Sequence, residues 1–277
     1  MTRWKAIGWT VAFFVAGIAL TVGVNIALAR GFPALDRLAA GVIAQIVGFG
    51  AATWGIGGGA LRWGWKELRY IGAGDPLKGA GLGFALGAAP AILAMVVAVP
   101  AGGAGWSPDG GAFGSWAAAI GGLALILVPA AFSEELIFRG FGYVALTRAF
   151  GRLGPAVVLS VLFAAAHIGN PNVTTLGLVN VGLAGVWLSA AFWLPGGIWT
   201  ATGTHLGWNI TLAALGAPVS GLAFTLPMLD YATGGPQWLT GGAFGPEGGV
   251  IATLIVGVST VALLRRTTHH APRTEEA

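Results

Sequence analysis

Residues 133–141 read SEELIFRGF and directly follow the run GGLALILVPAAF, which has the composition of a membrane helix. Carboxylates and an arginine are costly in hydrocarbon unless they are paired or reached by water, so they mark functional sites by default. Glu135 and Arg139 are four residues apart on one helix face, which predicts an ion pair with a structural role. Glu134 lies about 100° around the helix from Glu135 and therefore needs another partner.

Two later apolar stretches carry polar groups that can partner Glu134. FAAAH places His167 four residues after Phe163, and HLGWN places Asn209 four residues after His205. A lone His or Asn on a membrane helix commonly forms a structural hydrogen bond to a neighbouring helix. The other two of the four histidines, however, lie in the polar C-terminal tail. We therefore expect Glu134, His167, His205 and Asn209 to form one inward-facing cluster. A base near a water molecule and donors near an oxyanion are what peptide hydrolysis requires.

The composition places these residues in a membrane protein. Of 277 residues, 56% are hydrophobic and 9% are charged, against about 25% charged in a soluble chain. No cysteine is present, which excludes disulfides and Cys-ligated metal. The net charge of +4 is better explained by basic cytoplasmic loops than by a nucleic-acid partner. The predicted fold is all-α, a polytopic bundle of transmembrane helices in a lipid bilayer.

A span needs roughly 20 apolar residues. Eight segments meet this description: 6–29, 38–61, 78–101, 117–142, 153–169, 175–194, 197–215 and 248–264. The first also resembles a signal peptide, because Arg3 and Lys5 precede it and Ala27-Leu28-Ala29 looks like a cleavage site, but it exceeds the usual apolar core of about 7–15 residues. We expect it to be retained.

The basic residues predict the orientation. With the N-terminus inside, all of the 14 Lys and Arg residues except Arg30 and Arg37 fall in cytoplasmic segments, Arg273 of the tail included. This bias predicts an even number of spans and both termini in the cytoplasm, in a membrane that we expect to be the bacterial inner membrane. The segment 65–76, WKELRYIGAGDP, is expected at the cytoplasmic interface because it mixes aromatic and charged residues.

Three regions are predicted along the chain: an N-terminal two-helix segment (1–64), a core (65–264) and a polar cytoplasmic tail (265–277). Gly79, Gly83 and Gly87 form a double GxxxG pattern, which favours close helix contact within the bundle over a dimer face. The sequence leaves the oligomeric state open.

The positions of the residues along their helices show whether the members of the predicted cluster can lie at the same depth in the membrane. If the fourth span continues to Arg148, Glu134 and His167 both lie about 21 Å from the connection that follows it, whereas His205 lies about 12 Å from the LPGG break before the seventh span. The mismatch would be resolved if the fourth helix breaks after Arg139 or if the seventh helix is displaced.

The motifs carry a family resemblance. EELIFR matches EExxxR, FAAAH matches FxxxH and HLGWN matches HxxxN, in order and each in a predicted span. Over about residues 65–264 the chain resembles the CPBP family of intramembrane proteases, also called the CAAX-protease and bacteriocin-processing (Abi) family, and FGPEGG (244–249) is similar to many bacterial members.

The resemblance implies a role for each residue. Glu134 would polarise the attacking water together with His167, and His205 and Asn209 would stabilise the oxyanion. Glu135 and Arg139 would hold the fourth helix in place. Ser133 is interpreted as a helix hydroxyl bonded to the backbone rather than as a nucleophile.

The cofactor and the activity stay open at this point. Glu134, His167 and His205 could ligate zinc with an open fourth position, but HExxH is absent and a metal-free glutamate mechanism is favoured. The expected substrate is a membrane-associated protein or peptide, prenylated or leader-type. Two non-enzymatic alternatives are an immunity or scaffold protein and, with no inverted repeat of the motifs to favour it, a small transporter.

Overall fold

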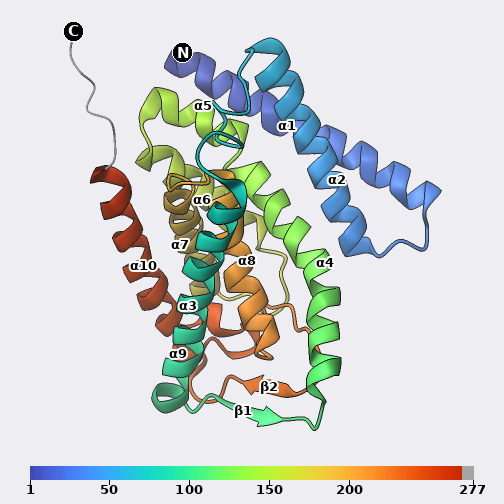
Figure 1. Ribbon diagram of the computed structural model, residues 1–277, viewed down its shortest axis with the longest axis vertical. Coiled ribbons are helices and arrows are strands. Elements are labelled where there is room, and N and C mark those ends of the chain that lie inside the picture. Colours follow the sequence, from blue (N-terminus) through green and yellow to red (C-terminus); the bar gives the residue numbers. More distant parts are fainter. Residues whose placement is uncertain (270–277) are drawn as a thin grey trace.

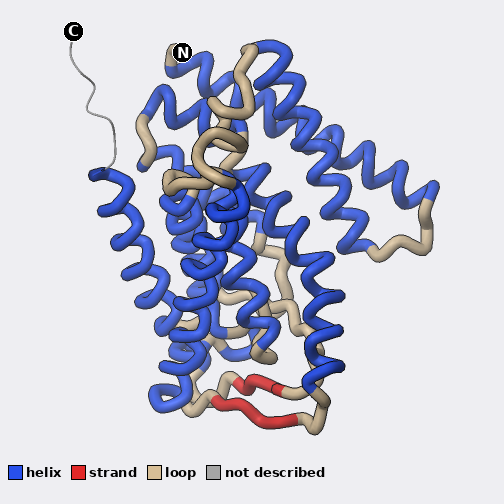
Figure 2. Tube along the Cα trace, in the orientation of Figure 1, coloured by secondary structure: helices blue, strands red, loops and turns tan. Residues whose placement is uncertain are grey.

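The computed structural model describes residues 1–269 and is a bundle of helices with one small antiparallel sheet at one end (Figures 1 and 2). This confirms the predicted all-α membrane fold. The tail beyond residue 269, including Arg273, lies outside the described residues. The helices are α1 (Arg3–Gly31), α2 (Arg37–Ala52), α3 (Pro76–Gly102), α4 (Phe113–Phe138), α5 (Phe141–Phe150), α6 (Leu153–Ala166), α7 (Thr175–Ala191), α8 (Ile198–Ala214), α9 (Gln237–Thr240) and α10 (Val250–His269).

Shorter elements complete the chain. A π-helix (Thr53–Ala60) continues α2, and strands β1 (Gly105–Pro108) and β2 (Leu229–Ala232) pair with Gly105 opposite Ala232. Two 3-10 turns, Gly242–Phe244 and Pro246–Gly248, precede α10. The strands were not predicted from the sequence.

Within residues 1–269, five segments contain helices long and apolar enough to cross a membrane: Arg3–Gly31, Arg37–Ala60, Pro76–Ala101, Phe113–Phe150 and Val250–Thr267. Each of the eight predicted spans contains a helix, but α6, α7 and α8 have only 14, 17 and 17 residues. These three helices are shorter than the roughly 20 residues of a full membrane span. Residues 167–174 leave the helical conformation between α6 and α7, and such backbone is tolerated at membrane depth where it lines a cavity.

The end of α4 is set by Gly140. Arg139 caps the helix, and a Cβ added at Gly140 would lie 2.1 Å from the carbonyl oxygen of Leu136. Only glycine allows this approach, and α5 starts at Phe141. The assumption that this helix continues to Arg148 was wrong, and the alternative of a break after Arg139 is confirmed. Glu134 therefore lies little more than one turn from the end of its helix.

Helix α8 is held against α3 by small residues on both sides. A Cβ added at Gly83 would lie 2.2 Å from the carbonyl oxygen of Thr200, and one at Gly87 would lie 2.0 Å from that of Thr204. Gly203, on α8, makes the same kind of close approach to Ala80. The GxxxG pattern thus serves contact within the bundle, as predicted, and fixes the helix that carries His205 and Asn209.

The start of α1 and the end of α10 lie at the same end of the molecule, opposite the β-sheet (Figure 1). The loop that contains Arg69 is attached there to the end of α7, because the Arg69 guanidinium donates hydrogen bonds to the carbonyl oxygens of Phe192, Trp193 and Leu194 at 3.3, 3.3 and 3.0 Å. Burial lowers the pKa of Arg69. The arrangement is compatible with termini on one side of a membrane.

Candidate active site

The predicted ion pair is present behind the last turn of α4. Arg139 Nη1 lies 3.1 Å from Glu135 Oε1, and both side chains are buried. Arg139 also donates to the carbonyl oxygen of Gly185 on α7 at 2.8 Å, and its guanidinium lies 4.8 Å from the ring centroid of Phe163 on α6. The pair therefore joins three helices.

Glu135 has a second partner that the sequence did not predict. Nδ1 of His205 lies 2.9 Å from Glu135 Oε1, the same oxygen that contacts Arg139. An ionised carboxylate only accepts hydrogen bonds, so Nδ1 of His205 carries the proton. Glu135 thus fixes the orientation of His205, in addition to the support of α4 that was expected of it.

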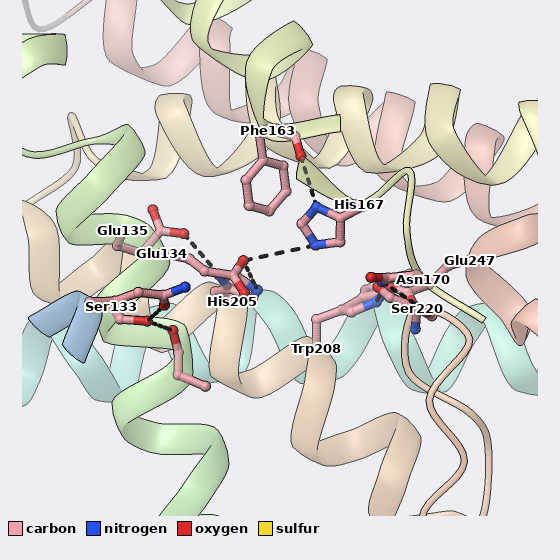
Figure 3. A network of polar contacts seen from close by, with 12 residues as sticks. Ser133, Glu134, Glu135, Phe163, His167, Asn170, His205, Trp208, Ser220 and Glu247 are labelled. Atoms are coloured by element: carbon pink, nitrogen blue, oxygen red, sulfur yellow. Dashed lines mark hydrogen bonds and ion pairs between the residues drawn. The ribbon is translucent and has the colours of Figure 1, made fainter. Parts of the chain in front are cut away.

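Glu134 lies about 100° around α4 from Glu135. Its buried Oε2 has no hydrogen-bond partner within residues 1–269. Two imidazole nitrogens face it: Nε2 of His205 at 3.7 Å and Nε2 of His167 at 4.0 Å (Figure 3). The structure therefore brings Glu134, His167 and His205 together, as the sequence predicted.

His167 caps the C-terminus of α6, where the FxxxH spacing brings it back to Phe163. Its Nδ1 lies 2.8 Å from the Phe163 carbonyl oxygen. A carbonyl oxygen only accepts, so Nδ1 carries the hydrogen and Nε2 of the neutral ring is an acceptor that faces Glu134.

Asn209 lies one turn after His205 on α8 and lines the same cavity. Its side-chain amide has no hydrogen-bond partner within residues 1–269. The amide is therefore free to bind a ligand beside the two histidines.

The cluster opens into a cavity of about 490 Å³ between the helices. Its walls are mostly apolar and come from both sides of α4. On the α1–α2 side they include Phe14, Ile18, Leu38 and Phe49, and on the α7–α10 side Ala184, Leu188, Ala252 and Val256.

The sequence analysis missed a second carboxyl group in this cavity. Glu247 Oε1 accepts a hydrogen bond from the indole of Trp208 at 2.9 Å, and Oε2 accepts from the Ser220 hydroxyl at 3.0 Å and from the Ser220 backbone N–H. Burial raises the pKa of the Glu247 carboxyl, while the hydrogen bonds from Ser220 and Trp208 oppose the shift. FGPEGG was the available signal, but it suggested family membership only.

Asparagines brace the segments around Glu247. Asn180 of α7 donates to the carbonyl oxygens of Glu247 and Gly249 at 2.7 and 3.0 Å, and Asn170 donates to that of Ser220 at 2.9 Å. Because the 215–249 segment has no regular period, sequence patterns could not place it beside His167.

Ser133 behaves as predicted. Its hydroxyl lies 2.8 Å from the Ala130 carbonyl oxygen and 2.9 Å from Gln45 Oε1 of α2. This contact attaches α2 to α4 next to Glu134.

Within residues 1–269, no group of three or more His, Cys, Asp or Glu side chains is arranged to hold a metal ion. Glu134 Oε2 faces the Nε2 atoms of two imidazoles whose Nδ1 atoms contact Glu135 and the Phe163 carbonyl oxygen, an arrangement that metal-ligating histidines also show. Zinc bound by Glu134, His167 and His205 therefore stays a prediction, and the mechanism below does not use it.

Comparison with protein families matches the part of the chain that carries the motifs. Residues 115–211 match the family described as "Rce1-like: Type II CAAX prenyl endopeptidase Rce1-like". The match covers α4 to α8 and includes all three motifs, and it confirms the resemblance to the CPBP, or CAAX-protease, family. It supports an endopeptidase embedded in the membrane. The predicted region boundaries at 64 and 264 stay predictions.

Comparison with curated proteins found no match, and neither did comparison with solved structures.

Proposed function

We propose that the protein is an intramembrane endopeptidase that hydrolyses a peptide bond of a membrane-associated protein or peptide. The observation that carries the proposal is the buried, unpartnered Oε2 of Glu134 facing the Nε2 atoms of His167 and His205. A buried acceptor without a donor is costly. A water molecule or a substrate group at this point would remove that cost.

Water activation follows from the hydrogen positions. Nε2 of neutral His167 and the Glu134 carboxylate are both acceptors, so they do not bond to each other. A water molecule between them would donate one hydrogen to each. As its oxygen attacks the peptide carbonyl carbon, Glu134 takes the proton and later gives it to the leaving amine when the C–N bond breaks.

The developing oxyanion would be stabilised from α8. Because Nδ1–H of His205 donates to Glu135, His205 can donate from Nε2 only when it is protonated, and its position between two carboxylates favours that form. The free amide of Asn209 is the second donor. Donors aimed at developing charge are the largest single contribution in many enzymes.

The apolar walls of the cavity suit a lipid-attached or apolar segment, which supports a prenylated or leader-type substrate. We further propose that the chain lies in a bacterial inner membrane with both termini in the cytoplasm, because the basic residues gather at the end that holds the start of α1.

The test is cleavage by purified protein in detergent or liposomes. Prenylated peptides and apolar leader-type peptides are incubated with wild type and with Glu134→Gln, and the products are identified by mass spectrometry. Cleavage by wild type alone supports the proposal. No cleavage of either class would favour the immunity or scaffold alternative, and equal cleavage by both proteins would remove Glu134 from the mechanism.

Metal dependence requires its own experiment. We propose that Glu134 and His167 activate water without a metal ion, so zinc content of the purified protein should be far below one ion per chain and chelators should leave cleavage unchanged. One zinc per chain in wild type that is lost in His167→Ala would establish the metal alternative.

A further inference from the structure

Gln45 of α2 lines the cavity but belongs to none of the three motifs and has no part in the mechanism above. Leu38 and Phe49 line the cavity as well, and their spacing of seven and four residues from Gln45 places all three side chains on one face of α2. Helix α2 packs against α4 and lies outside the residues that match the family. The cavity wall therefore contains an amide that the segment from α4 to α8 does not supply.

The Gln45 side chain is held next to the proposed base. Ser133 Oγ lies 2.9 Å from Gln45 Oε1 and 2.8 Å from the Ala130 carbonyl oxygen, and these two acceptors share the hydroxyl hydrogen. Ser133 directly precedes Glu134 on α4, where each residue rises about 1.5 Å along the helix. The contact therefore keeps the Gln45 amide at the depth of Glu134.

The amide nitrogen of Gln45 carries two hydrogens and has no acceptor within residues 1–269. Its side chain is half-buried and lines the cavity, so a ligand in the cavity can reach the nitrogen. Several other donors of the wall are already used. The Trp208 indole and the Ser220 hydroxyl donate to the Glu247 carboxylate, and Asn180 donates to two backbone carbonyl oxygens. Gln45 thus offers a donor that the described part of the chain does not use.

A peptide in this cavity brings backbone groups that need partners, because unpaired N–H and C=O groups away from water are costly. The helices of the wall use their own backbone groups in helical hydrogen bonds, so they present no strand edge to which a peptide could be added. Side-chain amides must therefore supply much of the pairing. Among the amides that line the cavity within residues 1–269, those of Gln45 and Asn209 have a nitrogen without an acceptor.

The kind of substrate group follows from the donor. A side-chain N–H pairs with a carbonyl oxygen, and the residues of an extended peptide recur about every 3.4 Å. Asn209 comes from α8 and is aimed at the oxyanion of the cleaved bond in the mechanism above. Gln45 comes from α2 at the depth of Glu134, which places its nitrogen near a carbonyl beside that bond.

We propose that Gln45 is a substrate-binding residue: its Nε2 donates a hydrogen bond to a backbone carbonyl oxygen of the substrate within one or two residues of the cleaved bond. Ser133 is the positioning residue that holds the amide. This inference rests on the proposed peptidase function and makes it more specific, because it gives α2 a direct part in recognising the peptide. The recognised group is common to all peptides, so Gln45 fixes the register of the chain rather than selecting a side chain.

Binding and cleavage are measured separately so that the two proposals can fail separately. The probe is a dye-labelled prenylated peptide with two series of analogues, in which one backbone amide at a time is replaced. An alkene removes both the carbonyl oxygen and the N–H, whereas an ester removes the N–H and keeps the carbonyl oxygen. Binding is measured to Glu134→Gln protein in nanodiscs of uncharged phosphatidylcholine, so that no analogue is cleaved.

One alkene analogue, with the replacement next to the cleaved bond, should bind about 3–10-fold more weakly than its ester counterpart, as expected for one neutral hydrogen bond. The difference should vanish when Gln45→Leu is added. Gln237→Leu makes the same change at the chain's other glutamine, which is exposed and outside the cavity, and should keep the difference.

Kinetics give a second readout, with Glu134 intact. Gln45→Leu should raise KM by about 3–10-fold and leave kcat nearly unchanged, because the bond is present in the ground state and in the transition state alike. Ser133→Ala removes the contact that holds the amide and should raise KM by about twofold, at the lower end for one hydrogen bond. A fall in kcat with unchanged KM in Gln45→Leu would contradict the proposed role.

An alkene series that binds like the ester series at every position overturns the inference, even if Gln45→Leu fails to fold. A position at which alkene and ester weaken binding equally would show that the substrate N–H is recognised, which also overturns it. A difference that depends on Gln45, without cleavage of the peptide by wild type, supports the binding role and contradicts the peptidase.

Discussion

The last turns of α4 carry two adjacent carboxyl groups, Glu134 and Glu135, whose surroundings differ. Glu135 is buried, and its Oε1 contacts Arg139 and His205. Oε2 of the neighbouring Glu134 is buried without a hydrogen bond among the described residues, and this side chain lines the cavity. Oε1 of Glu135 has two close partners, which is compatible with a structural role, although its Oε2 has no hydrogen bond within residues 1–269. In the same part of the chain, Glu134 has only the longer contacts to the two histidines and a cavity beside it, which is compatible with a ligand. Adjacent residues can therefore have different functions because of their surroundings alone.

The cavity side should be the more sensitive in catalysis. His167→Ala removes the acceptor that holds the attacking water, and turnover should fall by about 10²–10⁴, the range typical of a lost general base. The melting temperature should change little, because the half-buried His167 side chain makes a single hydrogen bond within residues 1–269, to the Phe163 carbonyl oxygen, and its contact with Glu134 is longer, at 4.0 Å. Initial rates and thermal melts in the same detergent are the measurements. A variant with normal turnover would leave Glu134 to act without His167.

The oxyanion donor on α8 gives the next largest effect. Asn209→Ala should lower turnover by roughly 10²–10³, the scale seen when one such donor is lost. Substrate binding should change little, because the donor acts on charge that develops in the transition state. Unchanged turnover would indicate that Asn209 has a structural role between helices rather than a role in catalysis.

Substitutions in the Glu135–Arg139 pair should lower the free energy of unfolding. Arg139→Gln removes the charge that balances Glu135, and breaking a buried pair costs about 3–5 kcal/mol. Adding Glu135→Gln should recover part of this loss, which unfolding of the two single variants and the double variant would measure. A double variant with the summed loss of both single variants would contradict the pairing.

The smallest effect concerns the support of α8. Gly87→Ala brings a methyl group against the Thr204 carbonyl oxygen, so it should cost about 1–3 kcal/mol as overpacked sites do. Gly81→Ala is the matched control on the same helix, because nothing lies within 4 Å of its Cβ position. Equal melting temperatures of the two variants would show that the α3–α8 contact adapts.

The spacing of residues along the sequence predicted the ion pair within α4. The presence of polar residues in apolar spans predicted which side chains gather around Glu134. Glu135 and Arg139 are in contact because residues four apart share one helix face. The polar side chains of three spans lie together because exposing any of them to lipid costs free energy. The contact of His205 with Glu135 joins α8 to α4 and follows from no such spacing.

Other features needed information that a pattern does not contain. The break at Gly140 could be predicted only as one of two alternatives, because residues 141–150 continue the apolar composition of α4. The place of Glu247 was missed because it depends on turns at Ser220 and Gly221, both with positive φ, rather than on a periodic element. Such loops are fixed by tertiary contacts with Trp208 and Asn180.

The difference between the two glutamates is the central claim, and one paired measurement tests it: melting temperature and turnover of wild type, Glu134→Gln and Glu135→Gln. Glu134→Gln should melt like wild type and lose nearly all turnover. Glu135→Gln should melt lower and also lose about 10–100-fold in turnover, as variants of groups that orient a reactive residue do, because it no longer holds His205. If Glu134→Gln cleaves like wild type while Glu135→Gln is stable and inactive, the assignment of the two acids is reversed.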